Sequence, residues 1–384
     1  MTNAGGRVDA PAPGARYIMI GGFLGAGKTT AIGRLARRLT EQGTRVGIIT
    51  NDQGQNLVDT ITLRAQGFAT EEIAGGCFCC RFDELVEAVG RLREQARPQV
   101  LLAEPVGSCT DILATVAYPL RRLYSGDFTV APVSVLVDPF RAERIFKLAP
   151  GGVFSDKVAY IYRKQIEEAD LVVLTKIDLF PAVRLDPLRR FIEREFPGKE
   201  ILAVSPREGQ GLEAWFARLL QEQQAAGMRL DVDYDAYAEG EASLGWLNCT
   251  AQLQARRAFD ADRFLEELAR GVRSELARLK GALAHLKITF VPEEGLPGDV
   301  AVLSLVRGDF VPEFAFHLEA PVTSGRMVLN LRAELAPESL AAVVQTALTT
   351  ATAHFTMLHG SIENLEHFRP GRPVPTHRFA EAAG

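Results

Sequence analysis

The chain has 384 residues, of which 47% are hydrophobic and 24% charged, as in a globular protein with a substantial core; collagenous and disordered classes are excluded. The net charge is -5 with both signs interspersed, so no basic face is available for nucleic acid or for an anionic membrane. No stretch approaches the roughly 20 apolar residues of a membrane span, and residues 1–15 lack an apolar leader, so we expect a cytoplasmic protein.

In a chain of this length two domains are expected. We predict a disordered tail over residues 1–15, a first domain over 16–223 and a second domain over 244–370. Residues 224–243 are polar and acidic without apolar periodicity, which indicates a linker. The proline-rich residues 371–384 are expected to form an extended tail.

Short apolar runs alternate with amphipathic segments through the first domain, which is the pattern of strands joined by crossover helices. The predicted strands are 16–20, 44–50, 98–104, 133–138, 170–176 and 200–205, and the clearest helices are 29–43 and 83–96. Most of these strands are apolar throughout, as expected when helices cover both faces of a parallel sheet. The sequence therefore predicts an α/β domain with a doubly wound, mostly parallel sheet.

The second domain is predicted to be a smaller α+β unit of β-α-β-β-α-β type. Its expected elements are strands at 245–253, 285–291 and 299–306, helices at 260–284 and 337–355, and a last strand at 361–368. Strand-like text also runs through 326–335, so the sequence leaves the topology open.

A phosphate-binding loop follows the first predicted strand and opens the first helix. The stretch GGFLGAGKTT has the G-x4-G-K-T spacing of this loop, whose backbone N–H groups cradle phosphates. Lys28 is expected to reach the β- and γ-phosphates, and the Thr29 hydroxyl to bind Mg²⁺. The residues predicted to bind the nucleotide here are Gly22, Gly25, Ala26, Gly27, Lys28, Thr29 and Thr30.

The stretch TKID, at the end of a late strand, indicates that the base is guanine. The Asp178 carboxylate can accept from guanine's ring N–H and amine, whereas adenine would leave buried groups unpaired. Thr175 and Lys176 complete the motif, the lysine stem lying along the base. Ser205, after the next strand, is expected to contact the base edge through its backbone, so GTP is predicted over ATP.

Two further acidic residues end strands that should meet at the same edge of the sheet. Glu104 in AEPVG is predicted to hold Mg²⁺ directly or through water, and Gly107 to bring its N–H against the γ-phosphate. Asp52 in TNDQG is expected to complete the Mg²⁺ or water network. We therefore predict Lys28, Asp52 and Glu104 as catalytic residues; the alternative for Glu104 is a cap on the turn after its strand.

Three of the five cysteines lie together in GGCFCC. Cys77, Cys79 and Cys80 are soft thiolate donors that suit a transition metal, and the helix expected near residue 83 should lower their pKa values. A reducing compartment disfavours a disulfide, while packing cysteines or a redox-sensing pair stay as alternatives. We expect Cys109 and Cys249 to be buried, although Cys109 is near enough in the chain to join the site.

Taken in order, GGFLGAGKTT, TNDQGQNLVD, GGCFCC, AEPVG and TKID resemble the metallochaperone GTPases of the CobW, UreG and HypB group. The CobW-like branch is the most similar, because its members carry a G-C-x-C-C motif. Two departures concern the stretch after the second strand, where Asp52 and Gln55 replace two glutamates of the usual pattern, whereas Asp59 matches a later acidic position. Thr175 replaces the usual Asn of the guanine motif.

The resemblance implies slow hydrolysis of GTP to GDP and phosphate, coupled to delivery of a transition metal to a client protein. The implied cofactors are GTP and Mg²⁺, with Zn²⁺ as the metal and Co²⁺ as the alternative, and a homodimer that forms with bound nucleotide is also considered. The alternative function is a GTP-dependent chaperone for a cofactor-bearing enzyme, in which the cysteines are structural or sense redox state. A small-molecule kinase with the same phosphate loop is a further alternative.

Overall fold

A computed structural model describes residues 14–54, 58–151, 154–224, 230–296 and 298–379. Within these residues the first domain contains a parallel sheet with the order β3-β2-β4-β1-β6-β7-β8, and β5 pairs with β1. The predicted doubly wound parallel sheet is confirmed. The sequence did not predict β3 or β5, because β3 reads ATEEI with little apolar character and β5 has only three residues.

The strands of the first domain are β1 (Ala15–Gly22), β2 (Val46–Asn51), β3 (Ala69–Ile73), β4 (Val100–Glu104), β5 (Phe128–Val130), β6 (Ser134–Val137), β7 (Leu171–Leu174) and β8 (Glu200–Ala203). Its helices are α1 (Lys28–Glu41), α2 (Val58–Ala65), α3 (Phe82–Ala96), α4 (Tyr118–Leu123), α5 (Pro139–Ile145), α6 (Asp156–Glu168), α7 (Ala182–Glu195) and α8 (Leu212–Gln221), with a π-helical turn η1 (Leu113–Ala117) before α4. Apolar clusters fill both faces of this sheet, which explains the unbroken apolar strands.

The second domain follows helix α9 (Tyr234–Ser243) and is an antiparallel sheet with the order β12-β11-β10-β13-β9-β14. Its elements are β9 (Gly245–Phe259), α10 (Ala261–Arg278), β10 (Ala282–Pro292), β11 (Ala301–Leu305), β12 (Glu313–Phe316), β13 (Val322–Glu334), α11 (Pro337–Ala353) and β14 (Leu358–Phe368). The separate α+β unit agrees with the prediction, and strand β12 is an addition at the sheet edge.

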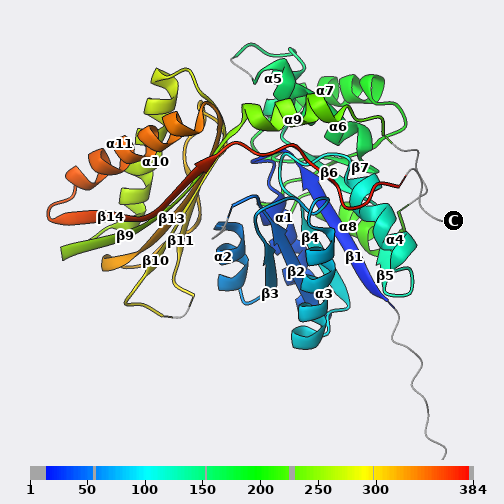
Figure 1. The fold of residues 1–384 in the computed structure, drawn as a ribbon, viewed down its shortest axis with the longest axis horizontal. Helices are drawn as coiled ribbons and strands as arrows, with labels where there is room; N and C mark the ends of the chain where they lie inside the picture. Colours follow the sequence, from blue (N-terminus) through cyan, green and yellow to red (C-terminus); the bar gives the residue numbers. More distant parts are fainter. Residues whose placement is uncertain (1–13, 55–57, 152–153, 225–229, 297, 380–384) are drawn as a thin grey trace, which may run out of the picture.

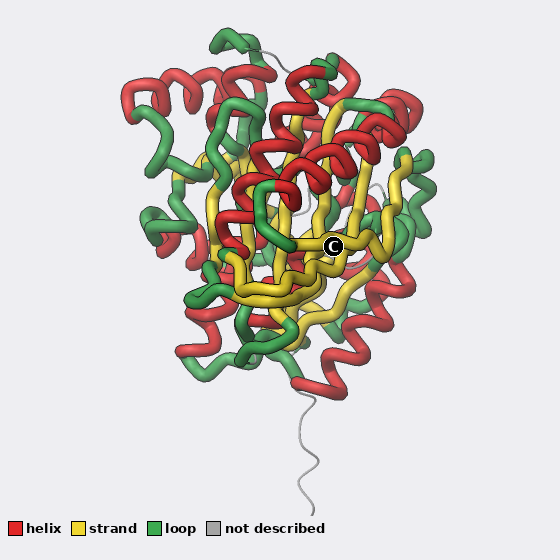
Figure 2. Tube along the Cα trace, turned by 90° about the vertical axis from the view of Figure 1, so that its left-hand side faces the viewer, coloured by secondary structure: helices red, strands yellow, loops and turns green. Residues whose placement is uncertain are grey.

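The two faces of the second sheet have different roles. Helices α10 and α11 pack on one face and bury the second apolar core, as Figures 1 and 2 show. The other face turns toward α2 of the first domain (Figure 1), where Val58 packs with Val300, Val302 and Val328. The sheet therefore contributes a wall to whatever site lies around α1 and α2.

The segment predicted as a linker contains a helix. In α9 the Asp233 side chain accepts hydrogen bonds from the N–H groups of Asp235 and Ala236, which caps the N-terminus. Tyr237 is fully buried against Ile161 of α6. The sequence pattern missed this helix because its contact with the first domain depends on few apolar side chains.

The tail after β14 has no helix or strand over residues 369–379 and crosses to the first domain near α4 (Figure 1). The predicted N-terminal tail lies mostly outside the described residues, and β1 begins at Ala15. Across the described ranges no helix is both long and apolar enough to cross a membrane.

Candidate functional site

The phosphate loop joins β1 to α1 in the strand–loop–helix arrangement that the sequence predicts. Gly27 has a φ of 95°, a left-handed conformation that favours glycine, and it precedes the first residue of α1. The buried Lys28 donates from Nζ to the Gly22 carbonyl at 3.0 Å. The ammonium is therefore held over the loop, at the N-terminus of a helix, where an anion would bind.

A cavity of about 400 Å³ opens above this loop. The predicted residues that line it are Gly25, Ala26, Gly27, Lys28, Thr29, Thr30, Glu104, Thr175, Lys176 and Asp178. The second domain forms part of the wall, with Lys287, Val302, Ser304, Val306, Glu313, Phe314, Ala315 and Phe316. The cavity thus lies between the two domains.

Gly22, Gly107 and Ser205 lie outside the lining of this cavity. Gly107 packs behind the phosphate loop, where an added Cβ would lie 2.7 Å from the Leu24 side chain. Ser205 is fully buried, and its N–H donates to the Gln210 carbonyl at 2.9 Å. Ser205 and Gly107 therefore support the loops around the cavity. The contact of Gly107 with the γ-phosphate and that of Ser205 with the base edge stay predictions.

Oxygen ligands gather beside Thr29. The distance from Thr29 Oγ1 is 2.7 Å to Asp59 Oδ1 and 3.1 Å to Glu104 Oε1. Burial and then the Asp59 carboxylate raise the pKa of Glu104 to about 7. Glu104 Oε2 is buried without a hydrogen-bond partner in the structure. A hydroxyl and two carboxylates are the hard ligands that Mg²⁺ prefers, and a cation here would satisfy that oxygen. The residues present therefore fit magnesium.

Asp52 lies elsewhere than predicted. Both of its carboxylate oxygens accept from Arg332 Nη2, at 3.1 and 3.2 Å, and it is not part of the cavity lining. Asp59, in the first turn of α2, lies beside Thr29 instead. Gln55, which the resemblance marked as a departure, lies outside the described residues.

The guanine motif is fixed directly to the phosphate loop. Thr175 Oγ1 donates to the Ala26 carbonyl at 2.9 Å, and Lys176 Nζ donates to the Gly25 carbonyl at 2.7 Å. Lys176 Nζ also pairs with Asp138 Oδ2 at 2.7 Å. Asp178 is exposed at the cavity wall, so its carboxylate is available to a base bound there.

The three cysteines of GGCFCC form a turn that leads into α3. Cys77 Sγ lies 2.7 Å from Cys79 Sγ and 3.3 Å from Cys80 Sγ, and the last pair is 3.7 Å apart. Four-coordinate zinc at about 2.3 Å from each sulfur implies sulfurs about 3.8 Å apart. The turn therefore needs only small adjustments to hold a metal on three thiolates, and all three cysteines are free.

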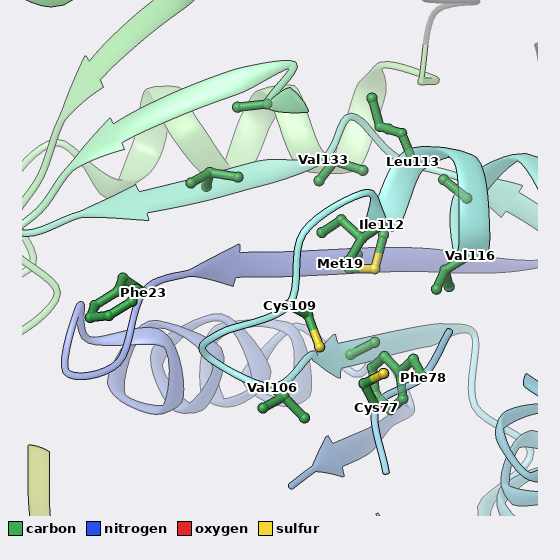
Figure 3. Close-up of a cluster of buried hydrophobic side chains, with 14 of the residues drawn as sticks. Met19, Phe23, Cys77, Phe78, Val106, Cys109, Ile112, Leu113, Val116 and Val133 are labelled. Carbon is green, nitrogen blue, oxygen red and sulfur yellow. The ribbon is translucent and has the colours of Figure 1, made fainter. Parts of the chain in front are cut away.

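A fourth thiol lies beside this group. Figure 3 shows Cys109, in the loop after β4, beside Cys77. Hydrogen bonds with Cys109 and then with Cys79 and Cys80 lower the pKa of Cys77, whereas the pKa of Cys79 is raised by its hydrogen bond with Cys77. The hydrogen bond between Cys77 and Cys80 raises the pKa of Cys80 to about 11. The expected lowering of all three pKa values is thus found only at Cys77, and neighbouring thiols cause it.

Two strand ends connect the oxygen ligands to the cysteines. Asn51 ends β2, donates to the Gly76 carbonyl at 2.6 Å and accepts from the Phe78 N–H at 2.9 Å. The chain continues from Asn51 to Asp59. The end of β4 likewise places Glu104 in the cavity and Cys109 against the cysteines. Each strand end therefore connects the oxygen ligands beside Thr29 with the cysteine turn.

The C-terminal tail covers the cysteine turn. The Thr376 N–H donates to the Cys79 carbonyl at 2.8 Å, and the Val374 N–H donates to Cys80 Sγ at 3.3 Å. Further along, Arg378 Nε pairs with the buried Asp111 at 2.6 Å. The tail is thus held at Cys80 and again by the two contacts that follow in the chain, at Thr376 and Arg378.

Ending the chain at Arg372 should therefore expose Cys80. We expect this thiol to react with a disulfide reagent roughly tenfold faster than in the full chain, since the tail residues that cover it are removed. Thiol labelling followed by peptide mass spectrometry measures the rate, with the buried Cys249 as internal control. An unchanged rate at Cys80, in a truncated chain that melts normally, would contradict this prediction.

Sequence reasoning missed Lys287 and Arg332, both from the second domain. Each lies in a strand on the face opposite the helices, between apolar neighbours that point into the second core. The signal that the sequence did contain was a single lysine or arginine between apolar residues of a predicted strand. Nothing in the sequence indicated which part of the first domain that face would meet.

Comparisons with known proteins agree with these motifs. Residues 16–202 match the family model described as "CobW/HypB/UreG, nucleotide-binding domain". The zinc chaperone YeiR of Escherichia coli (strain K12) is 32% identical over 167 residues, 42% of this chain and 47% of that protein. Urease accessory protein UreG 2 of Bradyrhizobium sp. is 30% identical over 219 residues, 54% of this chain and 91% of that protein.

The chain spans about half the length of the zinc chaperones it matches. Among solved structures, the Zn(II)-bound YjiA GTPase from E. coli matches over 87% of this chain and 99% of its own, with 14% identity and a TM-score of 0.39.

Proposed function

Because this chain belongs to the CobW/HypB/UreG family, we propose that it hydrolyses GTP to GDP and phosphate and couples this reaction to delivery of a transition metal to a client protein. Zinc is the proposed metal, with cobalt as the alternative. The observation that carries the proposal is that the same two strand ends reach both groups of ligands. Asn51 at the end of β2 and Cys109 after β4 contact the cysteine turn, and Asp59 and Glu104 from the same two segments lie beside Thr29.

In the proposed complex Lys28 and the loop N–H groups hold the phosphates, and Thr29, Asp59 and Glu104 hold Mg²⁺ directly or through water. Magnesium would neutralise the charge that develops on the phosphates. Asp178 would select guanine. A movement of Asp59 and of the end of β2 on hydrolysis would shift the contacts of Asn51 that position the cysteine turn.

The proposed coupling has a direct test in zinc affinity. We expect the Kd for zinc to differ about tenfold between the chain bound to GDP and the chain bound to a non-hydrolysable GTP analogue, both with Mg²⁺. A zinc-buffered competition titration measures both values. Equal affinities would refute coupling, and the cysteines would then be structural or redox-sensing, as in the alternative function.

We place this activity in the cytoplasm, where thiols stay reduced; the five free cysteines support this. The client is a metalloprotein or a cofactor-dependent enzyme. We also propose that a homodimer forms with bound nucleotide, a state that size-exclusion chromatography with GDP and with the GTP analogue would detect.

A further inference from the structure

A lysine of the second domain lies among the residues that would hold magnesium. Lys287 is in β10, and its neighbours Leu286 and Ile288 point into the second core, so its own side chain leaves the opposite face of the sheet. Its Nζ lies 3.3 Å from Thr29 Oγ1 and forms an ion pair with Asp59. The ammonium thus contacts two of the three oxygen ligands described above.

The charges around this ammonium balance one another. Burial alone would lower the pKa of Lys287, but Asp59 and then Glu104 hold it above its ordinary value. Burial would likewise raise the pKa of Asp59, and Lys287 is the main group that holds it low. With Lys28 close by, two ammonium groups face two carboxylates. Lys287 is therefore a fixed cation in this site.

A divalent cation at this position competes with the ammonium for the same oxygens. The Thr29 hydroxyl donates toward carboxylate oxygens and accepts from Lys287, so one of its two lone pairs is already occupied. Two cations on the same oxygens would also repel strongly at this separation. Bound Mg²⁺ therefore favours the release of Lys287 from Thr29 and Asp59.

We propose that Lys287 is an internal substitute for Mg²⁺ that holds the ligand site in the nucleotide-free chain, and that Mg²⁺ bound with nucleotide displaces it. This inference rests on the proposed binding of nucleotide at the phosphate loop. It assigns to the second domain a direct part in the nucleotide site, because a strand of that domain competes with the metal for the same ligands.

The displaced lysine belongs to a larger contact between the two domains. On the same sheet face Arg332 pairs with Asp52, and Asn330 Oδ1 accepts from the Val58 N–H at 3.1 Å. These contacts hold Asp52 and the first residue of α2 against the second sheet. Loss of the ion pair between Lys287 and Asp59 removes one of these connections, so the second domain responds to the occupant of the magnesium position.

Amine labelling of the unmodified protein tests the displacement. A short pulse of an acetylating reagent, read by peptide mass spectrometry, reports the accessibility of each lysine. We expect labelling of Lys287 to rise about tenfold when GDP and Mg²⁺ are added together, and to stay low with GDP and a chelator. The exposed Lys280 of the same domain serves as reference. Unchanged or reduced labelling of Lys287 would overturn the inference.

A pair of variants tests the competition itself. Lys287→Met removes the internal cation, so we expect Mg²⁺ to bind the GDP complex about tenfold more tightly, as measured by fluorescence of a labelled GDP during Mg²⁺ titration. Lys280→Met removes the same charge away from the site and should match wild type. Equal or weaker Mg²⁺ affinity in a Lys287→Met chain that melts cooperatively would contradict the proposal.

These outcomes separate the inference from the proposed function. A wild-type chain that binds neither GDP nor a GTP analogue, with or without Mg²⁺, removes the proposed function itself. A chain that binds nucleotide while Lys287 stays protected leaves that function intact and rejects only the displacement. If Lys287→Met fails to fold, the labelling of wild type decides alone.

Discussion

Replacing Asp178 by asparagine is expected to weaken GTP and GDP binding at least about 100-fold and to create a preference for xanthine nucleotides. The substitution changes only the carboxylate, which becomes an amide, since asparagine keeps the shape of the side chain. Guanine presents two donors to this position, and an amide offers one acceptor and a donor that repels the second. Xanthine presents an acceptor where guanine has its amine, so its pattern fits the amide.

The structure supports a local effect for this substitution. Asp178 is exposed at the cavity wall, whereas Thr175 and Lys176 fix the motif to the phosphate loop. Because those two anchors stay, the loop should keep its shape in the variant. Competition of GDP, xanthosine diphosphate and ADP against a fluorescent nucleotide measures the change in preference.

Asp186→Asn provides the matched control for Asp178→Asn. It makes the same chemical change at an exposed position of α7, outside the cavity lining, and should bind GDP as wild type does. Wild-type GDP affinity in Asp178→Asn would show that the base is read elsewhere. Equal loss of GDP and xanthosine diphosphate would show that the variant damages the phosphate loop.

The sequence predicted features that depend on neighbours in the chain. The phosphate loop needs a strand, a glycine-rich turn and a helix in succession, and residues 15–41 supply them. The cysteine turn needs a break before a helix, and GG before α3 supplies it. Both are local, so their patterns were visible before any contact between domains was known.

The positions of the acidic residues could not be predicted in the same way. Asp52 directly follows β2 and was expected in the magnesium network, but Arg332, 280 positions later in the chain, pairs with it. Asp59 takes the position beside Thr29 because α2 packs against the second sheet through Val58. Which carboxylate reaches Thr29 therefore depends on long-range packing, as does the presence of Lys287.

The second large effect is expected at the cysteines. Replacing Cys77, Cys79 and Cys80 together by serine should weaken zinc binding at least about 1,000-fold, because a neutral hydroxyl is a poor ligand for zinc compared with a thiolate. Zinc affinity measured by competition with a chromophoric chelator gives the value. Cys249→Ser, in the second sheet, removes a buried thiol far from the turn and should leave zinc affinity unchanged.

The same triple variant separates metal delivery from the alternative function, provided that nucleotide binding is measured in parallel. None of the three cysteines lines the nucleotide cavity, so GDP affinity should stay within about twofold of wild type. Cys77 and Cys79 are buried, and if their joint loss unfolds the chain, the half-buried Cys80→Ser alone tests the site. Full zinc affinity in either folded variant would place the metal elsewhere. Lost zinc binding with unchanged client maturation would show that the thiolates do not carry the delivered metal.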